Sequence, residues 1–129
     1  MNLTSVGYYK EMPQGKESDP SIYEFINRGE PQLKEKICAY LDEGILVIVC
    51  PGVTRDIVDE NAGPTGTGSA CTDGTWLWPD DLSYYVSKYN ISIPEAFLET
   101  MKVNNWKNSG EKLNLADEPL FIDGEIVIP

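Results

Sequence analysis

The chain has 129 residues and a formal net charge of −11, with 21 acidic side chains, 10 basic side chains and no histidine. This length is typical of one domain with a single hydrophobic core. Without histidine, the chain lacks the usual general base, the usual partner of a nucleophilic serine or cysteine, and the commonest metal ligand. The acidic excess also disfavours nucleic-acid binding, because it would repel phosphates.

The sequence carries no signal for export or for a membrane. The longest apolar run, residues 45–50, is much shorter than the roughly 20 residues that a membrane helix needs. The first eight residues lack the basic and apolar regions of a signal peptide. Three widely spaced cysteines without a CxxC motif argue against a disulfide scaffold or a zinc site: Cys38, Cys50 and Cys71. We therefore expect a cytoplasmic protein with reduced cysteines and without a metal or cofactor.

The first half of the chain is predicted to contain two helices and a buried strand. Apolar residues at helical spacing, with proline at the start and glycine at the end, indicate the two helices. A run rich in β-branched residues indicates the strand. The expected elements are an irregular segment 1–18, a helix at 20–28, a helix at 31–43, a strand at 45–50 and a possible returning strand at 53–58.

The second half is predicted to alternate loops with short elements. Four glycines indicate a loop, Asp-Gly pairs indicate hairpin turns, and prolines open two helices. The expected elements are a loop at 59–75, a strand at 75–78, a helix at 79–90, a helix from residue 94, a polar loop at 104–116 and a hairpin at 120–128. Together the elements predict a single α+β domain, 1–129, with a small, mostly antiparallel sheet and about four helices.

Acidic residues are concentrated in the middle of the chain, where residues 42–81 carry eight acids and one base, Arg55. Asp80 and Asp81 are explained by the first turn of the helix expected at 79–90, where acids offset the helix dipole. No helix end explains four others, which we predict to form a partner-binding surface: Asp56, Asp59, Glu60 and Asp73. A solvated acidic face is the plainer alternative, and a calcium site is disfavoured because the spacing does not fit an EF-hand.

Aromatic residues follow this acidic segment. Trp76 and Trp78 are two positions apart on an expected strand, so they share one face. Together with Tyr84 they either pack in the core or form an aromatic anchor for a protein partner. The sequence leaves both alternatives open.

The glycine-rich loop at 59–75 does not carry a nucleotide-binding signature. Gly66-x-Gly68 begins a dinucleotide fingerprint, but Cys71 stands where the third glycine belongs, and neither GKS nor GKT follows. Cys71 has only Asp73 as a charged neighbour in the sequence, so we expect an inert thiol. A small ligand or peptide bound by residues 61–75 and the tryptophans is the alternative function.

Several segments of the chain resemble an uncharacterised family of small bacterial cytoplasmic proteins. The resemblance lies in Gly7–Pro13, Tyr40–Gly44, Pro51-Gly52, Pro94–Phe97 and, most specifically, the block TDGxWxWPxDLxYYV at 72–86. The family has no established activity or catalytic residues. In size and charge such proteins are similar to immunity proteins, which protect bacteria from toxins of their own kind.

These observations favour a binding protein over an enzyme. The acidic excess and the aromatic residues predict that this chain binds a basic protein partner. Most concretely, it would be an immunity-type inhibitor that masks a toxin domain. The missing nucleophile–base pair disfavours catalysis.

Overall fold

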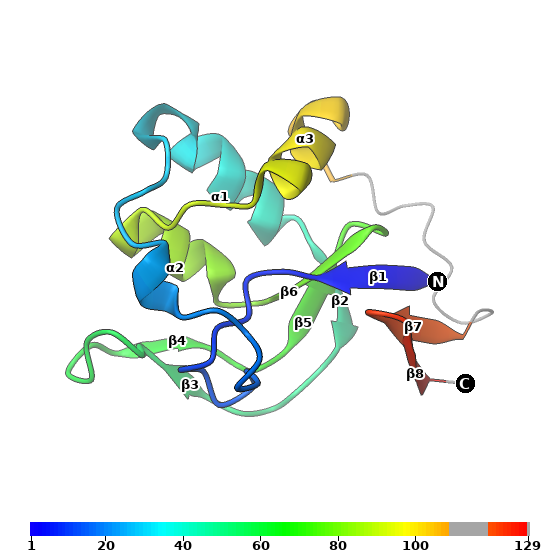
Figure 1. Cartoon of the computed structure of the whole chain (residues 1–129), viewed down its shortest axis with the longest axis horizontal. Coiled ribbons are helices and arrows are strands. Elements are labelled where there is room, and N and C mark those ends of the chain that lie inside the picture. The colour runs from blue at the N-terminus through cyan, green and yellow to red at the C-terminus, as the bar shows by residue number, and fades with distance from the viewer. Residues whose placement is uncertain (109–118, 129) are drawn as a thin grey trace.

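A six-stranded, curled sheet forms the base of the structure, a computed structural model that describes residues 1–108 and 119–128. In spatial order the strands are β2 (Ile45–Ile48), β5 (Ala70–Thr72), β6 (Trp76–Pro79), β1 (Asn2–Ser5), β7 (Leu120–Ile122) and β8 (Glu125–Ile128). Three α-helices lie on one side of it (Figure 1), namely α1 (Lys34–Asp42), α2 (Leu82–Tyr89) and α3 (Glu95–Val103). The predicted single α+β domain is confirmed, with three α-helices in the described residues rather than four.

The sheet is mixed because of its first strand. β1 runs parallel to both neighbours, β6 and β7, whereas the other neighbouring pairs of the sheet are antiparallel. The prediction that residues 1–18 are irregular is therefore wrong for residues 2–5. β1 is too short to show a periodic pattern, and its hydrogen-bonding partners lie far along the chain.

The helix expected at 20–28 shortens to one 3₁₀ turn, Ile22–Glu24. Ser21 and Glu24 form a capping box that begins the turn, and Asn27 adopts a left-handed backbone conformation, with φ 61°, soon after it. The next expected helix is confirmed: it starts with a 3₁₀ turn, Pro31–Leu33, and continues as α1.

Two short strands lie inside the segment predicted to be a loop, 59–75. Pro64–Gly66 forms β4, which pairs with β3 (Thr54–Arg55) in a separate two-stranded sheet. Ala70–Thr72 forms β5, between β2 and β6, and all three of its residues are buried. The returning strand expected at 53–58 is reduced to β3.

The remaining expectations concern the end of the chain. The hairpin predicted at 120–128 is confirmed as β7 and β8, with positive φ at both turn residues, Asp123 and Gly124. Most of the loop predicted at 104–116 lies outside the described residues.

The two faces of the sheet have different surroundings. The main core lies between the sheet and the helices, where Phe97 contacts Tyr40, Trp76 and Trp78 with ring centroids 5.2–6.2 Å apart. The opposite face carries a smaller apolar cluster, Leu3, Ala70, Leu77 and Leu120. Because side chains alternate along a strand, Leu77 projects away from the face that Trp76 and Trp78 share.

Candidate functional site

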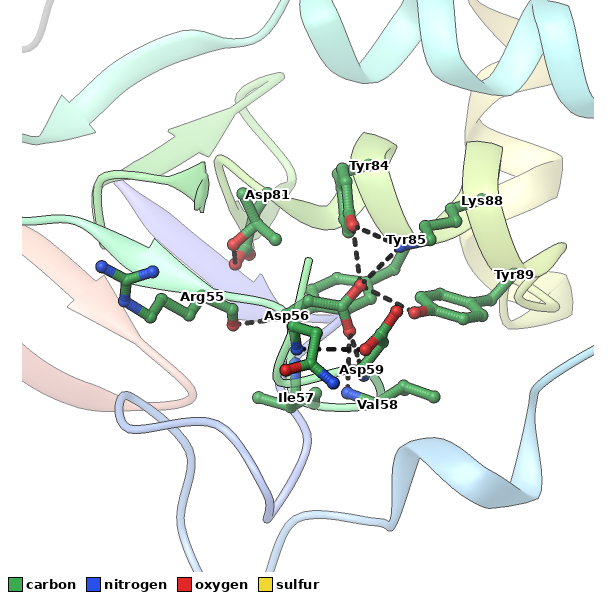
Figure 2. A network of polar contacts seen from close by, with 12 residues as sticks. Arg55, Asp56, Ile57, Val58, Asp59, Asp81, Tyr84, Tyr85, Lys88 and Tyr89 are labelled. Carbon is green, nitrogen blue, oxygen red and sulfur yellow. Dashed lines mark hydrogen bonds and ion pairs between the residues drawn. The ribbon is translucent and has the colours of Figure 1, made fainter. Parts of the chain in front are cut away.

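The carboxylate of Asp56 lies at the centre of a polar network between the end of β3 and α2 (Figure 2). Its Oδ2 accepts hydrogen bonds from the hydroxyls of Tyr84 and Tyr89, both at 2.7 Å, and from Nζ of Lys88 at 3.2 Å. Its Oδ1 accepts from the backbone N–H groups of Val58 and Asp59, at 2.8 and 2.9 Å. Five donors therefore occupy a group that has about four lone-pair sites.

These donors decide the charge of the buried carboxylate. Burial alone would raise the pKa of Asp56, but the hydrogen bonds from Tyr84, Tyr89 and the backbone outweigh it and hold the pKa well below its usual range. In turn, burial and the bond to Asp56 raise the pKa of Tyr89 to about 12. The cluster is thus an ionised acid surrounded by protonated donors, without a free group that could act as a base.

The same helix face also holds the backbone that follows β3. The hydroxyl of Tyr85 donates to the carbonyl oxygen of Arg55 at 3.2 Å and accepts from the N–H of Ile57 at 3.1 Å. Asp56 is only 4% exposed. The sequence prediction that Asp56 lies on a contact surface is therefore wrong, because its carboxylate is fully used inside the protein.

Asp80 and Asp81 also have a structural role different from the one expected. α2 begins only at Leu82, and Asp81, its N-cap, makes no side-chain capping bond. Instead, Oδ2 of Asp81 accepts from the hydroxyls of Thr54 on β3 and Thr65 on β4, both at 3.1 Å. Asp80 accepts from the backbone N–H and the hydroxyl of Thr67. Both acids hold the β3–β4 hairpin against the end of β6.

The remaining predicted acids do not form one cluster with Asp56. Asp59 and Glu60 are exposed in the loop after it. Asp73 lies in the β5–β6 turn, at the opposite end of β6 from Asp80. That turn and the β3–β4 hairpin are far apart in Figure 1. The structure therefore divides the expected acidic surface into two.

A second acidic cluster, which the sequence reasoning missed, lies at the carboxyl end of α1. Asp42 and Glu43 are exposed there, and the last turn contains no basic residue. Oδ2 of Asp73 accepts a 2.6 Å hydrogen bond from the hydroxyl of Tyr40 on the same helix. Burial, followed by Asp73 and Glu43, raises the pKa of Tyr40. Oδ1 of Asp42 accepts from the Ser83 hydroxyl at 2.6 Å, and Oε2 of Glu43 accepts from the Asn108 N–H at 3.1 Å, so among the described residues neutral donors and no basic side chain meet these two acids. We call Asp42, Glu43 and Asp73 the α1 acidic cluster.

The neighbouring strand β2 forms one edge of the sheet and carries exposed apolar side chains. Leu46 is 51% exposed, and Val49 and Val53, just beyond the strand, are 71% and 68% exposed. No charged residue occurs from Gly44 to Thr54. Natural edge strands are usually short or protected by lysine, proline or a covering segment. β2 has only four residues and Pro51 follows it, but it carries no protecting charge.

The predicted aromatic pair belongs to the core. Trp78 is 1% exposed and therefore is not a surface anchor. Trp76 is half-buried, contacts Phe97 in a tilted arrangement with centroids 5.2 Å apart, and donates from Nε1 to the Thr100 hydroxyl at 2.9 Å. Tyr84 is half-buried and bonded to Asp56. The shared face of the tryptophans is confirmed, and it faces the helices.

A cavity of about 370 Å³ lies against the opposite face of the sheet. Five strands, β1, β2, β5, β6 and β7, contribute lining residues, and the segment after β1 contributes most of the remaining wall. The lining residues are Ser5, Tyr8, Gln14, Lys16, Ser18, Asp19, Ile48, Gly68, Ala70, Leu77, Ile122 and Asp123. Of the loop and tryptophans predicted to form a ligand site, only Gly68 and Ala70 line this cavity.

Other chemistry is sparse in the described part of the chain. Residues 1–108 and 119–128 contain no group of three or more acids and cysteines placed to hold a metal ion. None of the described helices is long and apolar enough to cross a membrane. Cys38, Cys50 and Cys71 are free thiols, and burial raises the pKa of Cys71 to about 11.

No protein-family model matches the chain, and searches of curated proteins and of solved structures also find no match. The resemblance to a small bacterial family therefore stays a prediction, and the function has to be argued from the surfaces and the cavity described above.

Proposed function

We propose that this protein binds a basic protein partner, in the manner of an immunity-type inhibitor that masks a toxin domain. The observation that carries the proposal is the α1 acidic cluster. Acidic groups at the carboxyl end of a helix add to the negative end of its dipole, an arrangement that costs stability. A cationic partner would remove this cost on binding.

The surface around the cluster supports the same proposal. Within residues 1–108 and 119–128, ion pairs join Lys88 to Asp56 and Lys102 to Glu99, so the cluster has no basic partner there. The apolar edge strand β2 begins two residues after Glu43. Protein interfaces commonly combine an apolar centre with a charged rim. A partner strand that pairs with β2 would place its basic residues beside the cluster.

The experiment compares two acidic surfaces of this protein for their effect on binding one partner. That partner is the protein encoded by the gene immediately upstream of its own. Association rates are measured across a salt series for wild type, for Asp42→Asn/Glu43→Gln and for Asp59→Asn/Glu60→Gln. Glu17→Gln/Glu125→Gln changes the charge equally at exposed positions elsewhere and serves as the matched control.

We expect the first variant to associate about tenfold more slowly at low salt and the control to match wild type, because electrostatic attraction mainly raises association rates. The difference should vanish near 1 M salt, where the screening length falls to about 3 Å. A neutral or acidic partner, or rates that do not respond to salt, would overturn the proposal. A larger effect of Asp59 and Glu60 would move the contact to the loop after Asp56.

A further inference from the structure

The contacts of Asp81 carry an inference that is independent of the basic partner. Asp81 lies between β6 and α2 and is only 2% exposed. Its Oδ2 contacts the hydroxyl of Thr54 on β3 and the hydroxyl of Thr65 on β4. We propose that a proton on Asp81 holds the β3–β4 hairpin against the end of β6, and that loss of this proton loosens the hairpin.

Three oxygen atoms at this contact form a closed triangle. Oδ2 of Asp81 is 3.1 Å from each threonine hydroxyl, and the two hydroxyl oxygens are 3.0 Å apart. Three contacts at hydrogen-bond distance need three hydrogens, but two hydroxyls supply only two. If Asp81 is ionised, both hydroxyls donate to Oδ2 and the two threonine oxygens face each other without a hydrogen. A proton on Oδ2 completes a ring in which each oxygen donates once and accepts once.

The other carboxyl oxygen also favours the neutral acid. Oδ1 of Asp81 is buried and has no hydrogen-bond partner among the described residues. Ion pairs within residues 1–108 and 119–128 join Lys88 to Asp56 and Lys102 to Glu99, and Arg55 on β3 is exposed and outside them. A buried charge without a partner is far more costly than a buried neutral acid.

The titratable groups around Asp81 supply no positive charge. Asp80 precedes it, Tyr8 lies on the segment after β1, and Tyr85 lies on α2. Burial and then the charge of Asp81 raise the pKa of Tyr8, and burial together with Asp81 raises the pKa of Tyr85 to about 12, so both phenols stay protonated. Burial raises the pKa of Asp81 itself, the two threonine bonds offset part of the rise, and Asp80 adds to it.

The proposal gives the hairpin a defined dependence on pH. Once the hairpin loosens, water reaches the carboxyl group, and its pKa falls toward the unfolded value of about 3.9. Between that value and the higher pKa of the closed state, the loosened state binds fewer protons, so each pH unit raises the opening equilibrium about tenfold. Above the closed-state pKa the effect levels off. The loop at Asp56 stays attached to α2, because the pKa of Asp56 is lowered and its carboxylate remains ionised.

The test is an NMR titration of the full chain from pH 3 to pH 8. The ¹³C shift of the Asp81 carboxyl gives its native pKa, which we expect above about 3.9. Amide exchange rates, divided by the intrinsic rate at each pH, report the opening of the hairpin. Amides of β3 and β4 should lose protection up to the native pKa and no further, about tenfold for each unit by which that pKa is raised. The amides of Val58 and Asp59, which donate to Asp56, should keep their protection.

Two matched variants separate Asp81 from its neighbour. Asp81→Asn is neutral and supplies an N–H to the ring at every pH, so its hairpin protection should not change with pH. Asp80→Asn keeps Asp81 and removes a charge that raises its pKa, so it should retain the response with a lower midpoint. The wild-type titration decides even if a variant folds poorly. The proposal is overturned if Asp81 titrates at or below about 3.9, if hairpin protection is indifferent to that titration, or if the response survives in Asp81→Asn.

Discussion

The hydroxyl of Tyr89 donates a 2.7 Å hydrogen bond to Oδ2 of Asp56, which lies 33 residues earlier in the chain. Through this bond and its neighbours, the end of α2 fixes the exit of β3. Asp56 is therefore the residue whose loss should disturb the largest number of contacts between these two segments.

We expect Asp56→Ala to lower the free energy of unfolding by about 3–5 kcal/mol, because buried donors would lose their acceptor. Tyr89→Phe, which removes one bond to the charged carboxylate, should cost about 1.5–3 kcal/mol. Urea denaturation at pH 7 measures both. Asp59→Asn, at the exposed neighbour, is the control and should change stability little.

The stabilisation by Asp56 should depend on pH. The pKa of Asp56 is lower in the folded protein than in the unfolded chain, where it is about 3.9. The stabilisation is therefore present above pH 4 and is lost as the pH falls toward the folded pKa. The stability gap between wild type and Asp56→Asn should narrow below pH 4. A gap that stays constant down to pH 2 would contradict the ionised network.

Asp81 should show the opposite pH dependence. Burial raises its pKa above the unfolded value, hydrogen bonds from Thr65 and Thr54 offset part of the rise, and its Oδ1 is buried without a partner. Its favourable contribution is complete below about pH 3.9 and is lost as the pH rises through the folded pKa. Asp81→Asn should therefore gain stability relative to wild type between pH 4 and 7. Asp80→Asn is the control. If Asp81→Asn instead lost stability relative to wild type as the pH rises from 4 to 7, the assignment would be refuted.

The two tryptophans should respond differently to substitution although they share a strand face. Trp78→Ala should cost about 3–5 kcal/mol, because the indole is fully inside the main core. Trp76→Phe keeps the contact with Phe97 and loses the bond to Thr100, so it should cost about 1 kcal/mol. Thermal and urea denaturation of the variants measure both losses of stability. Equal losses for Trp76→Ala and Trp78→Ala would show that Trp76 is as deeply packed as its neighbour.

Gly44 has no room for a side chain. A Cβ at this position would lie 2.6 Å from Cζ2 of Trp78 and 2.8 Å from Cβ of Cys71. Gly44→Ala should therefore destabilise the protein by about 1–3 kcal/mol through overpacking. Gly63→Ala meets no atom within 4 Å and provides the matched control. Equal stability of the two variants would mean that the junction between α1 and β2 can relax.

The three thiols should react at different rates with Ellman's reagent at pH 8. Cys50 is exposed, whereas Cys71 is buried and its pKa is raised to about 11 by burial and by Asp80 and Asp42. Cys38 is partly buried and its pKa is also raised. We expect one fast equivalent in the native protein, which Cys50→Ser removes. A fast phase that persists in Cys50→Ser would show that a second thiol is open.

The elements that the sequence predicted well have local signals. Apolar periodicity identified α1, α2 and α3, and β-branched residues identified β2. The Asp123-Gly124 turn identified the last hairpin. β1 and β5 carry no such signal, because four and three residues show no period, and their neighbours in the sheet come from elsewhere in the chain. Long-range pairing alone makes them strands.

The acidic surface was predicted from residues that are close in the sequence. That criterion grouped acids that the fold separates, and it left out acids that the fold places together with one of them. Asp56 and Asp73 both belong to the acidic middle segment, but one is enclosed by α2 and the other is bonded to Tyr40 on α1. Asp42 and Glu43 carry no distinguishing signal in the sequence, because they end an ordinary amphipathic helix. Only the fold shows that a third acid, Asp73, is bonded to the same helix, through Tyr40.

The central place of β1 has a consequence for how the protein folds. β1 pairs with β6 and β7, and its Ser5 N–H binds the carboxylate of Asp123, 118 residues later. A chain emerging from the ribosome cannot complete this sheet until β7 and β8 have been synthesised. Contacts of such long range slow folding, since the loop must close before they form. Until then the apolar strand β2 lies in an incomplete sheet, which exposes it to association with other copies. The strongly negative charge of the chain around it would repel those copies.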